Sequence, residues 1–234
     1  MRIMSSPNFD SRPKGCAPDM LVLHYTGMTS GKAALARLTD PQSRVSAHYL
    51  IDEDGAVTAL VDEGNRAWHA GLSCWAGERD INGCSLGIEL VNPGHEWGYR
   101  PFPEAQMAAL EELAGALVRR WSIPPARVLG HSDVAPARRQ DPGELFDWAR
   151  LAGAGIGLWP PAPADAPILE TAELQTALAR FGYDITCDGL YGAQTRQVVS
   201  AFQRHFQPRA VTGRADGPTC GRLARLLELA GKSY

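Results

Sequence analysis

The fold is decided by the stretch Asp19-Met20-Leu21-Val22-Leu23-His24-Tyr25. Its four consecutive apolar residues are typical of a buried strand, and Thr26-Gly27 ends the run. Residues 85–91 form a second apolar run, and residues 127–129 a short third one. These three runs predict strands of one buried sheet.

Helices and a hairpin separate these strands. Residues 31–38 predict a short helix, and residues 103–121 a longer one with an apolar stripe at Leu110, Leu113 and Leu117. Residues 47–51 and 56–61 predict two strands joined by the turn Asp52-Glu53-Asp54-Gly55. The order strand, helix, hairpin, loop, strand, helix, strand indicates an α/β fold, a mixed β-sheet with flanking helices.

The composition changes after residue 158. Four prolines fall within residues 160–167, which favours a semi-rigid, extended linker. Apolar stripes in residues 168–234 predict a small three-helix domain. We therefore expect a catalytic domain at residues 1–158, a linker at 159–167 and a helical domain at 168–234. The helical domain looks like a binding or spacing module, because its single histidine, His205, has no second ligand-type residue near it in the sequence.

Net charge and hydropathy limit the classes of partner and the cellular compartments that we expect. The net charge of −3 shows no basic excess, so nucleic acid is not an expected partner. No apolar run approaches the ~20 residues that span a bilayer, and the first 15 residues lack an apolar signal core. We expect a cytoplasmic protein, or a periplasmic or envelope protein if an export signal has been removed. The oligomeric state stays open.

The five cysteines are an odd number and form no CxxC pair. The spacing therefore predicts neither a disulfide framework nor a cysteine zinc site, and it favours free thiols. Only Cys74 and Cys84 are close enough in sequence for a loop disulfide, which stays open as the alternative.

The first candidate metal ligands lie in the loop Gly130-His131-Ser132-Asp133-Val134-Ala135-Pro136-Ala137-Arg138-Arg139-Gln140-Asp141. Imidazole and carboxylate are both zinc ligands, and a catalytic zinc usually keeps three protein ligands and one open position. His131 and Asp141 with His24 make such a set. Zinc would activate water and polarise a carbonyl.

Two further residues complete a hydrolytic site. Glu89 lies in an apolar strand, where a carboxylate is costly unless it is paired or serves a nearby charge, and it is our candidate for the general acid/base. Arg139 is our candidate for stabilising an oxyanion. Structural alternatives remain: Glu89 as a salt-bridged edge residue, and His24 or His48 as hydrogen-bonding strand residues.

Five segments together resemble a known family. They are Leu21-Val22-Leu23-His24-Tyr25-Thr26, Ser46-Ala47-His48-Tyr49-Leu50-Ile51, Arg66-Ala67-Trp68-His69-Ala70-Gly71, Gly87-Ile88-Glu89-Leu90 and Gly130-His131-Ser132-Asp133-Val134-Ala135-Pro136. The chain resembles the zinc-dependent N-acetylmuramoyl-L-alanine amidases of the amidase-2 type, in particular the AmpD/AmiD-like enzymes. The resemblance covers about residues 19–150.

The resemblance implies roles for single residues. It implies that His24, His131 and Asp141 bind zinc and that Glu89 is the catalytic acid/base. Where this chain has Arg139, the family usually has lysine, and arginine keeps the charge on a planar fork. For substrate contacts we expect Trp68, His69, Ala70 and Asn92, with a packed loop anchor as the alternative for His69.

The helical domain resembles the peptidoglycan-binding-1 domain. The segments that carry this resemblance are Leu174-Gln175-Thr176-Ala177-Leu178, Asp188-Gly189-Leu190-Tyr191-Gly192 and Ala201-Phe202-Gln203. A catalytic domain followed by a proline linker and this domain is the arrangement of the two-domain, AmiD-like members.

The implied reaction cuts the amide between N-acetylmuramic acid and L-alanine in peptidoglycan or in muropeptides, 1,6-anhydro fragments included. Two alternatives remain. A non-catalytic recognition protein on the same fold would bind muropeptide without cutting it, and a carboxypeptidase would cut between two amino acids. The complete set of ligand candidates with Glu89 favours the amidase.

Overall fold

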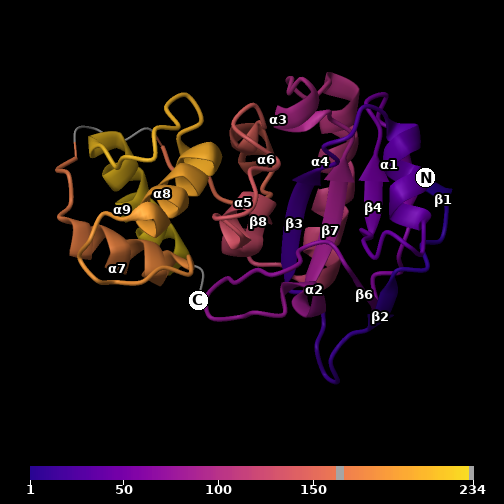
Figure 1. Cartoon of the computed structure of the whole chain (residues 1–234), viewed down its shortest axis with the longest axis horizontal. Coiled ribbons are helices and arrows are strands. Elements are labelled where there is room, and N and C mark those ends of the chain that lie inside the picture. Colours follow the sequence, from indigo (N-terminus) through magenta and orange to yellow (C-terminus); the bar gives the residue numbers. More distant parts are fainter. Residues whose placement is uncertain (162–165, 232–234) are drawn as a thin grey trace.

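The computed structural model describes residues 1–161 and 166–231, which form a sheet-containing domain and a helical domain beside it (Figure 1). Part of the expected linker, residues 162–165, lies outside the described residues, as do the last three residues of the chain. Among the helices of the described part, none is both long and apolar enough to cross a membrane.

One six-stranded sheet forms the centre of the first domain. Its strands, from one edge to the other, are β1 (Arg2–Ile3), β5 (Val57–Ala59), β4 (Tyr49–Ile51), β7 (Ser85–Leu90), β3 (Met20–Tyr25) and β8 (Val128–Gly130). β3 pairs in parallel with both β7 and β8, and β4 with β7, whereas β4 and β5 are antiparallel. The expected mixed α/β sheet is confirmed, and the structure places β3 between the other two predicted apolar strands, β7 and β8.

Alternation along β3 assigns the two faces of the sheet. Leu21 and Leu23 pack against α4 (Glu104–Trp121) on one face. Met20 and Val22 point to the other face, where they join a different core cluster. His24 follows the same alternation, so its side chain lies on the face opposite α4.

A helix also covers part of that second face. α1 (Gly31–Thr39) packs Ala34 and Leu38 against Leu50 of β4. Ser30 caps this helix by accepting a hydrogen bond from the Ala33 N–H. α1 leaves the carboxyl ends of β3, β7 and β8 uncovered, and the site lies there.

Several short elements were not predicted. They are β1 at the edge of the main sheet, β2 (Phe9–Ser11) and β6 (Asn65–Ala67), which form a two-stranded sheet, and the helices α2 (Ile81–Cys84), α3 (Gly94–Trp97), α5 (His131–Val134) and α6 (Trp148–Gly153), with a 3₁₀ turn at Pro125–Arg127. Elements of two to six residues are too short for a hydrophobic period to be visible in the sequence.

The helical domain contains the three expected helices, α7 (Thr171–Phe181), α8 (Ala193–Phe206) and α9 (Gly217–Gly231). Its core joins that of the first domain, because Trp75 is 2% exposed and packs edge-on against Phe181 and Tyr183. Gly182 permits this contact: it has a φ of 142°, and a Cβ there would lie 2.5 Å from the Trp75 ring. The two domains therefore share one packed interface.

Candidate metal centre and active site

Strand register brings the predicted site residues together. His24 of β3 is the direct partner of Glu89 of β7, and Leu23 is the partner of Gly130 at the end of β8. His131 therefore begins α5 immediately beside His24. Residues at the carboxyl ends of adjacent parallel strands share one edge of a sheet, which is where such sheets usually bind their ligands.

Three buried ligand-type atoms meet at this edge. The Nδ1 atoms of His24 and His131 are 2.9 Å apart, and Oδ2 of Asp141 lies 3.1 Å from the first and 3.0 Å from the second. The three residues are 1%, 4% and 6% exposed. Among the described residues they are the group of histidine, cysteine and acidic side chains whose geometry suits a metal ion.

Hydrogen bonds at the far side of each ring indicate which nitrogen carries the proton. Nε2 of His131 lies 2.9 Å from the carbonyl oxygen of Ala70, which only accepts, so Nε2 donates and, in the neutral ring, Nδ1 is bare. Nε2 of His24 lies 3.0 Å from Nδ1 of His69.

His69 continues this chain of hydrogen bonds. Its Nε2 is 3.1 Å from Oγ of Ser85, whose hydroxyl donates to the carbonyl of Ile81. Since the serine hydroxyl proton is directed to Ile81, Nε2 of His69 donates and Nδ1 of His69 accepts. Nε2 of His24 therefore donates to His69, and Nδ1 of His24 is bare as well.

This donor set fits a zinc ion. Two Nδ1 atoms and a carboxylate oxygen stand 2.9–3.1 Å apart, and in the tautomers assigned above no proton lies between the two nitrogens, so that a cation can join them. Ligand atoms about 2.0–2.1 Å from a tetrahedral zinc are about 3.3 Å from one another, close to the observed spacing. Orientation of each imidazole by a second hydrogen bond is the usual support of a zinc histidine.

Electrostatics keep the set in its ligating form. Burial, reinforced by the neighbouring His131, lowers the pKa of His24 to about 4, so the ring is neutral at pH 7. Burial acts to raise the pKa of Asp141, but the two histidines outweigh it and hold that pKa well below its usual range. At neutral pH His24 therefore offers a neutral imidazole and Asp141 a carboxylate, the forms in which these two residues bind a metal.

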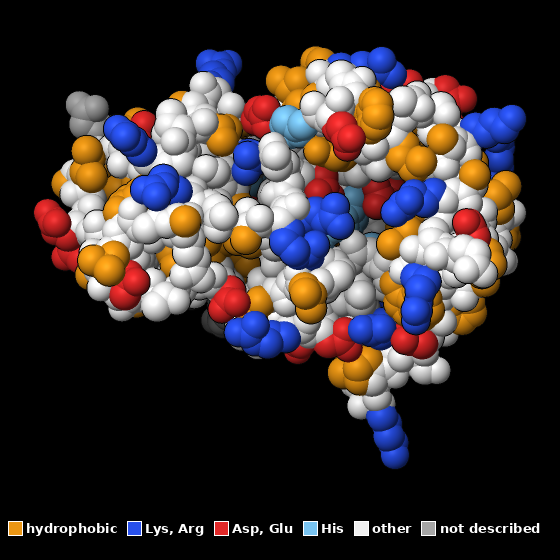
Figure 2. All heavy atoms as spheres, in the orientation of Figure 1, with side chains coloured by type: hydrophobic (Ala, Val, Ile, Leu, Met, Phe, Trp, Pro, Cys, Tyr) orange, Lys and Arg blue, Asp and Glu red, His pale blue; other side chains and the backbone are white. Residues whose placement is uncertain are grey.

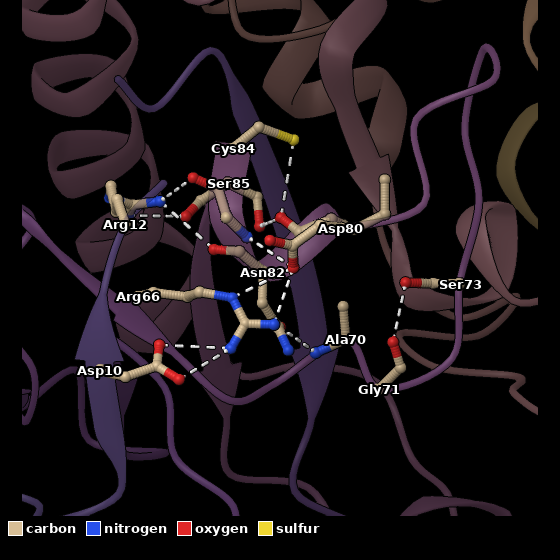
Figure 3. A network of polar contacts seen from close by, with 12 residues as sticks. Asp10, Arg12, Arg66, Ala70, Gly71, Ser73, Asp80, Asn82, Cys84 and Ser85 are labelled. Carbon is tan, nitrogen blue, oxygen red and sulfur yellow. Dashed lines mark hydrogen bonds and ion pairs between the residues drawn. The ribbon is translucent and has the colours of Figure 1, made fainter. Parts of the chain in front are cut away.

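A polar network fixes the loop that carries Ala70 and His69 (Figure 3). Arg66 binds Asp10 on one side and Asp80 on the other. Asp80 caps α2, and Oδ1 of Asn82 in this helix accepts hydrogen bonds from the backbone N–H groups of His69 and Ala70. The loop that orients both ligand histidines is thus anchored to α2.

Gly87 makes room for the His69 ring. A Cβ at this position of β7 would lie 2.5 Å from Cγ of His69. His69 is 9% exposed, and its ring meets that of His24 edge-on. The neighbouring His48 takes no part in the cluster: its Nδ1 accepts from the N–H of Gly87 and its Nε2 lies 3.2 Å from the carbonyl of Asn65.

Glu89 lies beside the three ligand-type residues with an unsatisfied carboxylate. Its Oε2 is buried and makes no hydrogen bond with any described residue. Burial and the charge of Asp141 raise the pKa of Glu89 well above its usual range, and Arg139 opposes the shift. A carboxyl with a raised pKa and a free oxygen is suited to take up and release a proton during a reaction.

A cleft of about 750 Å³ opens above this group. In Figure 2 acidic and histidine side chains are visible at the bottom of a hollow with basic side chains at its rim. Glu89, His131 and Asp141 line the cleft, and Arg139 lies at its exposed edge. The side chain of Arg139 makes no hydrogen bond or ion pair with another described residue, so its guanidinium is available to a ligand.

The four expected substrate contacts have different surroundings. Trp68 lines the cleft and is half-buried. His69 lines the cleft, but both of its ring nitrogens bond His24 and Ser85. This arrangement favours the alternative role of His69 as a packed loop anchor. Ala70 is fully buried and offers its carbonyl to His131. Asn92 is fully buried and does not line the cleft; its side chain bonds Arg100 and Gly94, so its expected substrate contact has to be revised.

The helical domain contacts the loop that carries His131, which the sequence did not reveal. Asp133 is fully buried, and its Oδ2 accepts from the N–H of Gly130 at 2.8 Å. Tyr183 donates to Oδ1 at 2.7 Å, and Nδ1 of His205 lies 2.7 Å from Oδ2. The interpretation of His205 as an isolated residue was wrong, because it also stacks on Trp148 of the first domain.

The sequence of the first domain matches a known family. Residues 14–144 match the N-acetylmuramoyl-L-alanine amidase family, which is more than half of the chain. The chain belongs to this amidase family. Amidases of this family are zinc enzymes in general, in agreement with the His24–His131–Asp141 cluster that the structure offers to a metal. Residues 169–223 match a family of peptidoglycan binding domains.

Curated amidases resemble the chain over most of its length. It is 40% identical to the N-acetylmuramoyl-L-alanine amidase AmiD of Escherichia coli, over 91% of this chain and 83% of AmiD. It is 34% identical to the 1,6-anhydro-N-acetylmuramyl-L-alanine amidase AmpD of Haemophilus influenzae, over 64% of this chain and 89% of AmpD.

Solved amidase structures have the same fold. Escherichia coli AmiD in complex with anhydro-N-acetylmuramic acid-L-Ala-D-γ-Glu-L-Lys superposes with a TM-score of 0.83 at 39% identity, covering 94% of this chain and 93% of AmiD. AmpDh3 of Pseudomonas aeruginosa in complex with an anhydromuramic pentapeptide superposes with a TM-score of 0.83 at 32% identity, covering 93% and 94%. Both domains of this amidase therefore have counterparts in substrate-bound relatives.

Proposed function

We propose that the chain hydrolyses the amide bond between N-acetylmuramic acid and L-alanine in peptidoglycan or muropeptides, with zinc as its cofactor. The observation that carries this proposal is the meeting of two imidazole nitrogens and a carboxylate beside the unpaired carboxyl of Glu89. A metal-ligand set next to a free acid/base group at the floor of a cleft is what amide hydrolysis needs.

His24, His131 and Asp141 would hold the zinc ion. When bound there, zinc lowers the pKa of water and polarises the carbonyl of the scissile amide. The hydrogen bonds from His131 to Ala70 and from His24 to His69 keep both Nδ1 atoms directed at the ion.

Glu89 would move the proton. Its carboxylate takes a proton from the attacking water, and the resulting carboxyl gives it to the departing amine of L-alanine. Burial raises the pKa of Glu89 well above its usual range, which makes its carboxylate a stronger base than an ordinary glutamate and favours uptake of the proton from water. Arg139 would stabilise the negative charge that develops on the former carbonyl oxygen, as lysine does in most of the family.

The substrate class comes from the relatives. The AmiD structure contains a muropeptide fragment, and AmpD is named for 1,6-anhydro-N-acetylmuramyl substrates. We propose that the same amide is cut here, by a catalytic unit at residues 1–158 followed by a linker at 159–167 and a helical domain at 168–234. The match to peptidoglycan binding domains supports a role of the last unit at the wall polymer.

Zinc content and product masses test this proposal together. We expect about one zinc per chain and release of a peptide that begins with L-alanine from a muropeptide. Binding of muropeptide without zinc and without turnover would make the chain a recognition protein. A product cut between two amino acids would make it a carboxypeptidase.

The form of the substrate is a separate question with its own assay. Intact sacculi and soluble 1,6-anhydromuropeptides contain the same amide, and their relative rates of hydrolysis identify the preferred form. Faster turnover of sacculi would support an envelope location, and faster turnover of soluble fragments a role in cytoplasmic recycling.

A further inference from the structure

A second hollow, of about 260 Å³, lies where the loop after α5 meets α8. One wall is the loop segment that contains Arg138 and Arg139. The other is a face of α8 that presents Arg196, Ser200 and Arg204 at a spacing of four residues, one side of a helix. Both domains therefore contribute to this hollow, and each contributes two arginines.

The two walls are fixed relative to each other. His205, next to Arg204, is held 2.7 Å from Asp133 in α5, and its ring stacks on Trp148. Arg204 itself lies 3.4 Å from Oε1 of Gln140 across the hollow. A buried contact between the domains therefore fixes the positions of the arginines that line the hollow.

The hollow has an excess of positive charge. Of its four guanidinium groups, only that of Arg204 forms an ion pair with a described residue, Glu144, with Nε and Oε2 3.8 Å apart, whereas Arg138 and Arg139 lie near the acidic groups of the metal site without pairing with them. Arg138 and Arg196 donate to backbone carbonyls, which orient a guanidinium and leave its charge in place. Guanidinium groups that keep their charge in this way are suited to a carboxylate, which guanidinium binds by paired hydrogen bonds.

The hollow continues the active-site cleft. Arg138, Arg139 and Gln140 line both. A ligand in the cleft can therefore extend along these three residues towards α8. The muropeptide in the AmiD structure has free carboxylates beyond the amide next to muramic acid: a γ-linked glutamate keeps its α-carboxylate, and the peptide ends in another.

We infer that the arginine face of α8 and the Arg138–Arg139 edge of the cleft form a subsite for a carboxylate of the stem peptide being cut. This inference rests on the proposed amidase function and deepens it. It gives the helical domain a direct part in selecting the substrate of the metal site.

Arg196→Gln is the variant that tests the subsite, because Arg196 is exposed and belongs to no part of the metal site. The substrates are muramyl-L-Ala-γ-D-Glu-L-Lys and the same molecule with its peptide carboxylates converted to amides. For the acidic substrate we expect kcat/KM to fall about fivefold, mainly through KM, as for loss of one partly exposed charge contact. For the amidated substrate we expect values within twofold of wild type.

Two further variants complete the experiment. Arg180→Gln removes an exposed arginine of α7 outside the hollow and should behave as wild type on both substrates. Arg196→Glu should reduce the preference for the acidic substrate further than Arg196→Gln does. The wild-type preference should also shrink between about 50 mM and about 500 mM salt, where exposed charges are screened.

Equal losses on both substrates, or an unchanged preference in Arg196→Gln, would overturn the subsite. A loss of activity of Arg196→Gln on intact sacculi, with no change on either soluble substrate, would also overturn it, because the arginines would then bind a neighbouring strand of the polymer. If the zinc-loaded wild type cuts both substrates equally well, the subsite fails while the amidase function stands. If it cuts neither, the proposed function fails first.

Discussion

The buried position of Glu89 lowers the stability of the protein when the carboxyl is ionised, yet it raises the pKa of the group that we expect to carry the proton. Its carboxyl is enclosed beside Asp141 with an oxygen that bonds no described residue, a state that costs stability once the group is ionised. The amide of a glutamine is almost the same shape and does not ionise. The loss of stability on ionisation of Glu89 is thus a consequence of placing a proton carrier with a raised pKa at this position.

This cost predicts a pH-dependent stability difference. The folded-state pKa of Glu89 is raised, so its contribution to stability is complete below its ordinary pKa and is lost as pH rises through the folded value. In the metal-free protein, Glu89→Gln should therefore raise Tm by about 2–4 °C at pH 8 relative to wild type. Thermal unfolding in the presence of a chelator measures this. A difference of the same size at pH 4 and pH 8 would refute the explanation.

The hydroxyl of Ser85 determines which ring nitrogen of His69, and through it of His24, carries the proton. Its hydroxyl accepts from His69, which lets His69 accept from His24 and keeps Nδ1 of His24 bare. Ser85→Ala removes this acceptor and should lower zinc affinity about tenfold. Competition with a chromophoric chelator measures the affinity. Ser43→Ala, a serine outside this chain of hydrogen bonds, is the control, and equal affinities in all three proteins would contradict the assignment of tautomers.

At the scale of elements, α8 supports the turn that presents His131. Its His205 and the nearby Tyr183 bind the carboxylate of Asp133, which also accepts from the Gly130 N–H one residue before the ligand. A buried carboxylate with three hydrogen bonds is well satisfied, whereas removal of one donor leaves part of it unpaired.

This contact makes His205 a testable positioning residue. His205→Leu removes the donor and should lower zinc affinity and kcat together with Tm. His205→Asn places an amide N–H near the position of Nδ1 and should recover most of the zinc affinity, although it loses the stacking on Trp148. Zinc titration of both variants separates positioning from packing. If the two variants bind zinc equally, the hydrogen bond to Asp133 does not support the ligand turn.

Sequence reasoning found the long elements and the ligand-type residues for a physical reason. The strand that contains His24 begins with a continuous apolar run, and Glu89 is conspicuous because a carboxylate interrupts another such run. The roles of Ser85, Ala70 and Asp133 were not predictable, since each depends on a partner distant in the chain. A backbone carbonyl such as that of Ala70 has no signature in the sequence at all.

The same distinction applies to the supporting elements. β2, β6 and α2 have three or four residues each, too few to show a period, yet they anchor the loop at His69. The zinc-ligand roles of His24, His131 and Asp141, the role of Glu89 and the oxyanion role of Arg139 stay predictions that the geometry supports.

At the scale of the molecule, the helical domain is part of the structure around the active site. Trp75 of the first domain lies in a core shared with α7 and α8, and Asp133 is buried by the same interface. A proline-rich linker suggested a separate module, but the contacts between the domains join them. The arginine-lined hollow lies at this junction.

Removal of the helical domain should therefore affect more than wall binding. A chain that ends at residue 158 would expose Trp75 and leave Asp133 without Tyr183 and His205. We expect a lower Tm and weaker zinc binding than in the full chain, because exposed apolar area and a less ordered ligand turn act together. Calorimetry and zinc titration of the two proteins test this. A truncated protein with the full chain's Tm and zinc affinity would show that the interface is not needed by the site.

The central claim is that three residues hold the metal while Glu89 carries the proton, and one variant separates these two roles. Glu89→Gln should retain about one zinc per chain and lose turnover of a muramyl-L-Ala peptide by about 100-fold or more, since general acid/base catalysis contributes on that order. Zinc content and product release are measured on the same sample. A variant that keeps its zinc and cuts the amide at a near-wild-type rate would contradict the account.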